Sequence, residues 1–307
     1  MAATTGRGKC RGLRTRDDMV MVSHGIAVQM TDHPPAPLVT RDQMTFVGLD
    51  LAWGWKNNTG LCAVRDGQVV ASALKKSDDD IVDWLQPYCD GSVLIAVDAP
   101  LIVANATGRR VCESIVSSWM GKYEAGAHSS NTGRPGFANG PRGAGLASRL
   151  GIGLDPALEP GKPTRRAIEV YPHPALVALF ELPKTIKYKA KKGRSREDRR
   201  VEFGRLTDCL EQLAQADPPL DVQCDRWRKL KAAIDTALTG AALDRIEDEL
   251  DAYVCAYIGL HYWTHGRPKS RVIGTLGEGY IVTPMATADG DVRDDLVAQL
   301  DTVEEAV

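Results

Sequence analysis

Five carboxylates stand at positions from which they could serve one chemical site. Asp50 interrupts the apolar segment "FVGLDLAW", Asp98 ends the apolar segment "SVLIAVD", and Glu169 lies within "RAIEVYPHPAL". Asp248 and Asp251, in "EDELDA", are three residues apart and therefore share one face of a helix. An unpaired carboxylate in a buried strand costs several kcal/mol, so these acids require a partner.

Convergence of the strand ends on that helix would bring the acids into strong mutual repulsion. Two like charges about 4 Å apart repel by roughly 4 kcal/mol at an effective dielectric constant of about 20. Either the pKa values of such acids rise, or divalent cations bind between them. Ligation by carboxylates alone favours Mg²⁺ or Mn²⁺ over zinc. The pattern therefore predicts a site for two such ions, suited to hydrolysis of a phosphodiester.

The elements that must position these acids follow an α/β pattern. Three strands are predicted first, and an Asp-Gly hairpin turn in "RDGQ" joins the second to the third. A helix with a Ser/Asp N-terminus follows, and then "SVLIAV", which is apolar throughout, as a parallel strand buried on both faces would be. We expect a fifth strand in "RAIEVYPHPAL", a mobile loop at 126–145, and a long helix over 242–263.

The motifs "GLDLAWG", "AVDAP", "RRVCE", "EVYPHPAL", "DELDA" and "EGYIVTP" occur in an order that resembles an uncharacterised bacterial and archaeal family of predicted RNase H-like nucleases. The resemblance covers roughly Thr45 to Pro284. It implies an RNase H-like α/β fold, in which a five-stranded mixed sheet with an antiparallel second strand is flanked by helices and carries loop and helical insertions. It also implies nucleic acid as the substrate.

The same resemblance assigns positions to the acids. Asp50 matches the first-strand acid, Asp98 the fourth-strand acid, and Asp248 with Asp251 the pair on the closing helix. The D…E…DxxD order is also similar to the RuvC branch, in which Glu169 would supply the middle acid. Whether Asp98 or Glu169 ligates the metal is left open, and all five acids are candidates for both ligation and catalysis.

Basic residues supply candidate phosphate contacts, because clustered Lys and Arg bind the nucleic-acid backbone through counterion release. The segment 184–206, "KTIKYKAKKGRSREDRRVEFGRL", has far more basic than acidic residues, although a solvated surface is the alternative. Arg109 and Arg110 follow Asp98 closely and could grip a phosphate or balance the acids. The candidate substrate-binding residues are Arg109, Arg110, Lys191, Lys192, Arg199 and Arg200. His173 could shuttle a proton or simply pack at the start of a helix.

Composition sets the outer limits of these predictions. The 307 residues are 43% hydrophobic and 25% charged, and the seven cysteines include no CxxC pair. With no signal-peptide core and no membrane-spanning run, the chain is expected in the cytoplasm. We expect a disordered extension at 1–43, the RNase H-like domain at 44–285 and an acidic flexible tail at 286–307. Nothing in the sequence indicates the oligomeric state.

Two other functions fit parts of the pattern. An ATP-using enzyme of the sugar-kinase and actin superfamily would share the strand order, but "VDAPLIV" lacks the glycine that such enzymes need after the second Asp. A module that binds nucleic acid without chemistry would keep the fold, although it would not need so many acids. A cleavage assay combined with a metal titration separates these possibilities.

Overall fold

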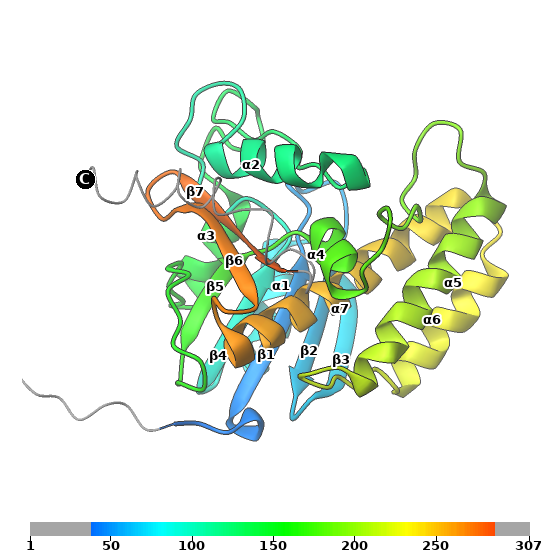
Figure 1. The fold of residues 1–307 in the computed structure, drawn as a ribbon, viewed down its shortest axis with the longest axis horizontal. Helices are drawn as coiled ribbons and strands as arrows, with labels where there is room; N and C mark the ends of the chain where they lie inside the picture. Colours follow the sequence, from blue (N-terminus) through cyan, green and yellow to red (C-terminus); the bar gives the residue numbers. More distant parts are fainter. Residues whose placement is uncertain (1–37, 286–307) are drawn as a thin grey trace, which may run out of the picture. The chain divides into compact units, whose positions relative to one another are not determined.

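A computed structural model describes residues 38–285 of the chain, and a five-stranded sheet forms its centre (Figure 1). The strand order is β3-β2-β1-β4-β5. Strand β1 pairs in parallel with β4, and β4 with β5, whereas β2 is antiparallel to both of its neighbours, β1 and β3. The strands are β1 (Met44–Asp50), β2 (Thr59–Arg65), β3 (Gln68–Lys75), β4 (Ser92–Val97) and β5 (Arg165–Glu169). The prediction of a mixed five-stranded sheet is confirmed.

Local sequence signals explain the first half of this sheet. Asp66 and Gly67 both have positive φ angles, 49° and 69°, as the predicted primed hairpin turn between β2 and β3 requires. Strand β4 is buried from Val93 onward, as expected for a parallel strand covered on both faces. Ser77 caps the helix between β3 and β4, at Asp78–Leu85, by accepting a hydrogen bond from the Asp80 backbone N–H.

Helices cover both faces of the sheet (Figure 1). One face packs against α4, α5, α6 and α7, and the other packs against α1 and α3. The α-helices are α1 (Asp78–Leu85), α2 (Val111–Met120), α3 (Arg142–Arg149), α4 (Pro172–Leu179), α5 (Arg196–Gln212), α6 (Asp225–Thr236) and α7 (Gly240–His265). Short 3₁₀ helices lie at η1 (Arg41–Gln43), η2 (Gln86–Tyr88), η3 (Gly121–Tyr123) and η4 (Leu213–Gln215).

Two glycines let α7 lie directly on the sheet. A Cβ at Gly48 in β1 would overlap the carbonyl oxygen of Ala252, and one at Gly60 in β2 would overlap that of Asp248. Gly60 is also the register partner of Asp50. The absence of a side chain at Gly60 therefore brings the Asp248 turn of α7 close to the end of β1.

Three segments differ from the expectations drawn from sequence. The predicted fifth strand is shorter, because β5 ends at Glu169 and α4 begins at Pro172, where the proline suits the first turn of a helix. The expected loop at 126–145 includes the start of α3, which has buried contacts through Leu146. A hairpin that was not foreseen, β6 (Ser270–Thr275) with β7 (Gly279–Pro284), packs with α2 in a separate apolar cluster.

The predicted ends of the domain fall only partly within the described residues. Residues 1–37 and the predicted tail at 286–307 lie outside them. Residues 38–43, which were assigned to the extension, are described: Arg41–Gln43 form η1, and the Val39 N–H donates to the Gly161 carbonyl at 2.9 Å. Packed structure therefore begins before Met44. Over residues 38–285, no helix has the length and apolar character needed to cross a bilayer.

Candidate functional site

The parallel pairing of β1 with β4 places Asp50 beside Asp98. Leu49 and Val97 are register partners, and the residue after each is one of the two aspartates. The Asp98 backbone N–H donates to the Leu49 carbonyl at 2.7 Å, so the two strand ends are joined at this point. Both carboxylates lie at the carboxyl ends of parallel strands, the edge of an α/β sheet where ligands commonly bind.

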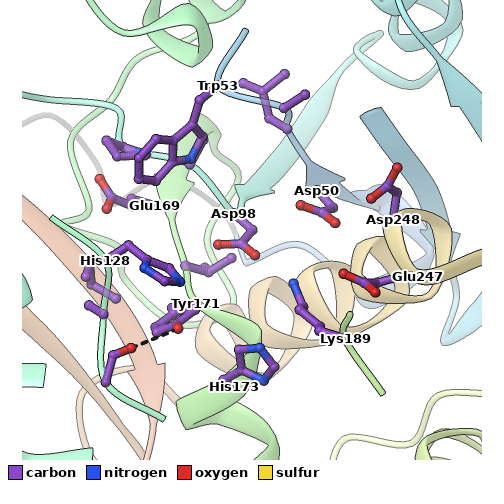
Figure 2. Close-up of a pocket in the computed structure, with 18 of the residues that line it drawn as sticks. Asp50, Trp53, Asp98, His128, Glu169, Tyr171, His173, Lys189, Glu247 and Asp248 are labelled. Atoms are coloured by element: carbon purple, nitrogen blue, oxygen red, sulfur yellow. Dashed lines mark hydrogen bonds between the residues drawn. The ribbon is translucent and has the colours of Figure 1, made fainter. Parts of the chain in front are cut away.

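Helix α7 brings Asp248 and Asp251 to the same edge. Its close contact with Gly60 sets the Asp248 turn against the end of β1. Asp248 lies at the surface of the cleft, next to Glu247, and Asp251 is fully buried beneath it. Figure 2 shows Asp50, Asp98, Asp248 and Glu247 facing one space. The structure thus brings together four of the five predicted acids as a cluster, named here the aspartate cluster: Asp50, Asp98, Asp248 and Asp251.

The aspartate cluster borders a cleft of about 340 Å³. Its acidic side is formed by Asp50, Asp98 and Asp248. The cleft is also lined by Trp53, which packs edge-on against Phe137 with ring centroids 5.1 Å apart. Lys189, Lys191 and Arg194 also line the cleft, together with Arg110 and the imidazoles of His128 and His173. A cleft with both signs of charge suits a ligand that carries phosphate and needs cations to bridge it to carboxylates.

Burial and nearby carboxylates raise the pKa values of Asp50, Asp98 and Asp248. Burial is the main cause for Asp50, whose pKa is raised well above its usual value, with Asp251 and Asp98 adding to the increase. Burial and then Asp251 raise the pKa of Asp98 to about 7, although Lys189 opposes this. The same two causes raise the pKa of Asp248 to about 7. The protein alone therefore stabilises the ionised forms of these three aspartates poorly.

Lys189 supplies one positive charge to the aspartate cluster. Its Nζ lies 2.6 Å from Asp251 Oδ2, and the hydroxyl of the preceding residue, Tyr188, donates to Asp251 Oδ1 at 2.6 Å. Burial alone would lower the pKa of Lys189, but Asp251, Tyr188 and Asp50 raise it well above its usual value. Lys189 is therefore a charged ammonium within the acidic side of the cleft.

Glu169 and Arg110, both predicted to contact ligands, form an ion pair with each other. Arg110 donates from Nη2 to Glu169 Oε1 at 2.6 Å and from Nη1 to Oε2 at 2.8 Å, and the Leu101 N–H also donates to Oε2 at 2.9 Å. Both carboxylate oxygens of Glu169 are thus satisfied within the protein. The pair lines the cleft, but neither charge is free.

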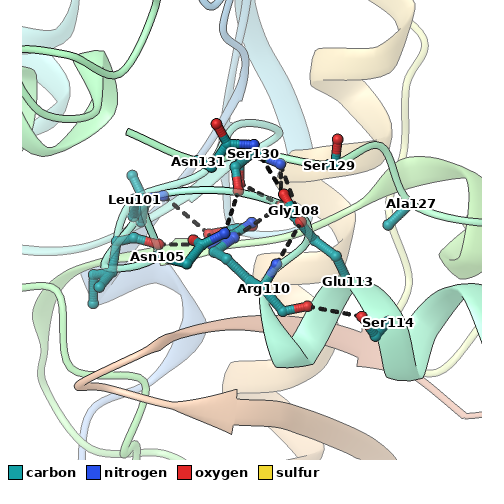
Figure 3. A network of polar contacts seen from close by, with 12 residues as sticks. Leu101, Asn105, Gly108, Arg110, Glu113, Ser114, Ala127, Ser129, Ser130 and Asn131 are labelled. Carbon is teal, nitrogen blue, oxygen red and sulfur yellow. Dashed lines mark hydrogen bonds and ion pairs between the residues drawn. The ribbon is translucent and has the colours of Figure 1, made fainter. Parts of the chain in front are cut away.

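The same arginine extends this network into the loop before α3. Arg110 Nε donates to Glu113 Oε1 at 2.9 Å, and Glu113 accepts from the Ser130 backbone N–H at 3.1 Å (Figure 3). His128, which lines the cleft, stands two residues before Ser130. Arg110 therefore fixes the loop that carries His128, and its position beside the acids reflects a structural ion pair.

The predicted basic residues separate into two groups. Lys191 lines the cleft, while Lys192 and Arg109 are exposed outside its lining. Arg199 is buried, donates from Nε to the Tyr188 carbonyl at 2.7 Å, and pairs with Asp244 at 2.8 Å and Glu247 at 3.1 Å. On α5, Arg200 pairs with Glu197 at 3.3 Å and donates to a backbone carbonyl. Arg199 thus holds the Tyr188 segment in place, and Lys191 is the predicted lysine that faces the cleft.

Several cleft residues were not selected from sequence as site residues. Lys189, Arg194, His128 and Glu247 all line the cleft. The sequence did contain a signal for Lys189. Ile186 and Tyr188 are apolar positions within a basic segment, both are fully buried, and Lys189 directly follows Tyr188. His173 lines the cleft with its Nδ1 2.9 Å from Thr185 Oγ1, and burial together with Lys189 and Lys191 lowers its pKa well below the usual value. His173 is therefore neutral.

The side chains at this site have the chemistry that a divalent cation requires, but they are not arranged as a complete set of ligands. Oxygen donors alone, with excess negative charge, are the set that Mg²⁺ and Mn²⁺ prefer. In residues 38–285, however, no group of three or more His, Cys, Asp or Glu side chains is arranged as a ready-made metal site. Lys189 contacts Asp251 where a cation would be needed. The donors suit a divalent cation, and an ammonium already neutralises part of their charge.

Comparison with known proteins defines the family. Residues 48–273 match the family described as "Protein of unknown function (DUF429)", and the chain belongs to this family. The matched region begins in β1 and ends in β6, so it includes the whole aspartate cluster. No curated protein and no solved structure matches the chain.

Proposed function

We propose that this protein is a metal-dependent hydrolase of phosphodiester bonds in nucleic acid, built on an RNase H-like fold. The observation that carries the proposal is the convergence of Asp50, Asp98 and Asp248 on one cleft, with Asp251 beneath them. The strand order supports the fold assignment, because β2 alone in the five-stranded sheet opposes the direction of the others.

Each side of the cleft has a defined task in this proposal. The aspartate cluster would hold two Mg²⁺ or Mn²⁺ ions, which when bound would activate a water molecule and stabilise the charge on the reacting phosphate. Lys191 and Arg194, on the basic side, would bind the phosphate backbone. Trp53 offers an aromatic surface at the cleft on which a base could stack. Glu169 and Arg110 keep the cleft wall in place and bind neither metal nor phosphate.

The two alternative functions gain less from the structure. An ATP-using enzyme of the sugar-kinase type would need a glycine-containing phosphate loop after Asp98, and Ala99, Pro100 and Leu101 occupy that position, all buried. A non-catalytic binding module would have no use for a set of crowded acids with raised pKa values. Parallel assays for ATP hydrolysis and for binding without cleavage test both.

The decisive experiment is a cleavage assay on single- and double-stranded DNA, RNA and hybrid substrates, with Mg²⁺ or Mn²⁺. The parent chain is compared with Asp50→Asn, which is nearly isosteric, and with Asp83→Asn, which makes the same change at an exposed site on α1. We expect metal-dependent cleavage by the parent and by Asp83→Asn, and a loss of several orders of magnitude in Asp50→Asn. Absence of cleavage with every substrate, or equal cleavage by all three proteins, contradicts the proposal.

A further inference from the structure

Lys189 places its ammonium in contact with Asp251, one of the carboxylates to which the proposed function assigns divalent cations. Its Nζ pairs with Asp251, whose side chain is fully buried, and the lysine side chain itself is only 24% exposed. Figure 2 shows this side chain pointing toward Asp50, at the acidic side of the cleft. The ammonium therefore supplies one positive charge to the group of carboxylates that the proposed function assigns to metal binding.

The segment around Lys189 is built so that the side chain can move while the backbone stays in place. Tyr188 is anchored by its hydrogen bond to Asp251 and by the Arg199 contact to its carbonyl. Immediately after Lys189 the chain is exposed over residues 190–193, and no helix or strand restrains it before α5. Because the lysine stem has four flexible carbons, rotation of its side chain can take the ammonium away from Asp251 without refolding the segment.

A divalent cation and the ammonium cannot share Asp251 at low cost, because like charges in contact with one carboxylate repel strongly. We propose that Lys189 is a resident counter-cation, which pairs with Asp251 in the metal-free protein and leaves it when a divalent cation binds. This inference rests on the proposed function.

Displacement of the Lys189 ammonium would also affect substrate binding. Lys189 and Lys191 line the same cleft, so the displaced ammonium would add to the positive charge on its basic side. The exchange thus moves one positive charge from the acids toward the position proposed for phosphate. Metal binding would thereby prepare the cleft for its anionic substrate.

Calorimetric titration of Mn²⁺ tests the exchange without any cleavage assay. Lys189→Gln removes the competing charge, so we expect it to bind Mn²⁺ about tenfold more tightly than the parent. Lys189→Arg keeps the charge and should not gain this affinity. Lys229→Gln, at an exposed lysine of α6 outside the cleft lining, should bind as the parent does. Equal or weaker binding by folded Lys189→Gln, with the parent binding Mn²⁺, overturns the inference and leaves the metal site intact.

A second measurement uses the parent chain and does not depend on the folding of a variant. An amine-reactive acetylating ester is applied with and without Mn²⁺, and the labelling of each lysine is measured by mass spectrometry. Labelling of Lys189 should increase severalfold on Mn²⁺ binding, while that of exposed Lys229 on α6 serves as the internal reference. Unchanged Lys189 labelling at saturating Mn²⁺ overturns the exchange. If no protein binds Mn²⁺ at all, the proposed metal-dependent function falls together with this inference.

Discussion

Two acids at neighbouring strand ends have opposite surroundings. Val97 and Glu169 are register partners in β4 and β5, so Asp98 and Glu169 stand side by side at one edge of the sheet. Glu169 is held by both Nη atoms of Arg110 and by a backbone N–H. Asp98 instead lies among other acids, and burial with Asp251 raises its pKa to about 7. Glu169, whose oxygens are both hydrogen-bonded within the protein, supports the fold. Asp98, which is surrounded by other carboxylates, can still bind a ligand.

The largest expected effect comes from exchanging Asp98 for its amide. Asp98→Asn should reduce cleavage by about 10²–10³-fold or more, because it removes a proposed ligand. In metal-free buffer the same variant should be at least as stable as the parent, since one repelling charge is removed. Cleavage rates with urea denaturation of the same samples measure both effects.

Glu169→Gln is the matched control for that exchange. It should lower stability by weakening the pair with Arg110, while the folded fraction keeps most of its cleavage activity. If instead it folds normally and loses cleavage as severely as Asp98→Asn, Glu169 is a metal ligand. The assignment of middle acid would then pass to Glu169.

Removing Arg110 should cost the fold more than any change in the aspartate cluster. Arg110→Met leaves Glu169 and Glu113 buried without their partner, and breaking such a buried pair costs about 3–5 kcal/mol. Arg109→Met, at the exposed neighbour, should change the free energy of unfolding by less than about 0.5 kcal/mol. Urea denaturation compares the two variants, and similar losses would show that the network is not the cause.

The sequence predicted the aspartate cluster because its determinants are local. Apolar strands that end in Asp50 and Asp98 and a helix with acids three apart are visible in the order of residues. The hairpin turn at Asp66 and Gly67 was equally local, and its φ angles confirm it.

The contacts that the sequence did not predict join residues that are distant in sequence. Arg110 and Glu169 are 59 residues apart, and Tyr188 is 63 residues from Asp251. A sequence pattern shows which residues are charged but not which opposite charge meets them after folding. Arg110 was therefore expected to contact phosphate, and Lys189 was not singled out among the surrounding lysines.

The pH dependence of stability should show the crowding of the aspartate cluster directly. Folding raises the pKa of Asp98 and Asp248 to about 7, above their unfolded values of about 3.9. The folded state therefore holds more protons than the unfolded state between about pH 4 and 7, and the free energy of unfolding falls as pH rises through this window. Denaturation in the presence of a chelator measures this slope. Asp98→Asn should flatten it, and a parent whose stability rises across the window contradicts the repulsion.

The smallest expected effect concerns the lysines of the segment after Tyr188. Lys191 lines the cleft and Lys192 is exposed, so both can reach phosphate, whereas Arg199 is buried against Glu247 and the Tyr188 carbonyl. Replacing Lys191 and Lys192 by Ser should reduce the slope of log affinity against log salt. The reduction is about 0.9 for each duplex phosphate that is no longer neutralised, or about 0.7 on a single strand. Binding measured in Ca²⁺ at several salt concentrations, on an uncleaved oligonucleotide, gives that slope.

Arg199→Ser provides the contrast within the same segment. It should lower stability, because it leaves Glu247 and the Tyr188 carbonyl without their donor, yet the salt slope of its folded fraction should stay near that of the parent. An unchanged slope in the lysine variant would mean that the segment is a solvated surface. A reduced slope in Arg199→Ser alone would mean that Arg199 leaves its buried partners to bind the substrate. Either result would contradict the distinction between charged groups that are paired within the protein, such as Glu169, and those that can bind a ligand, such as Asp98.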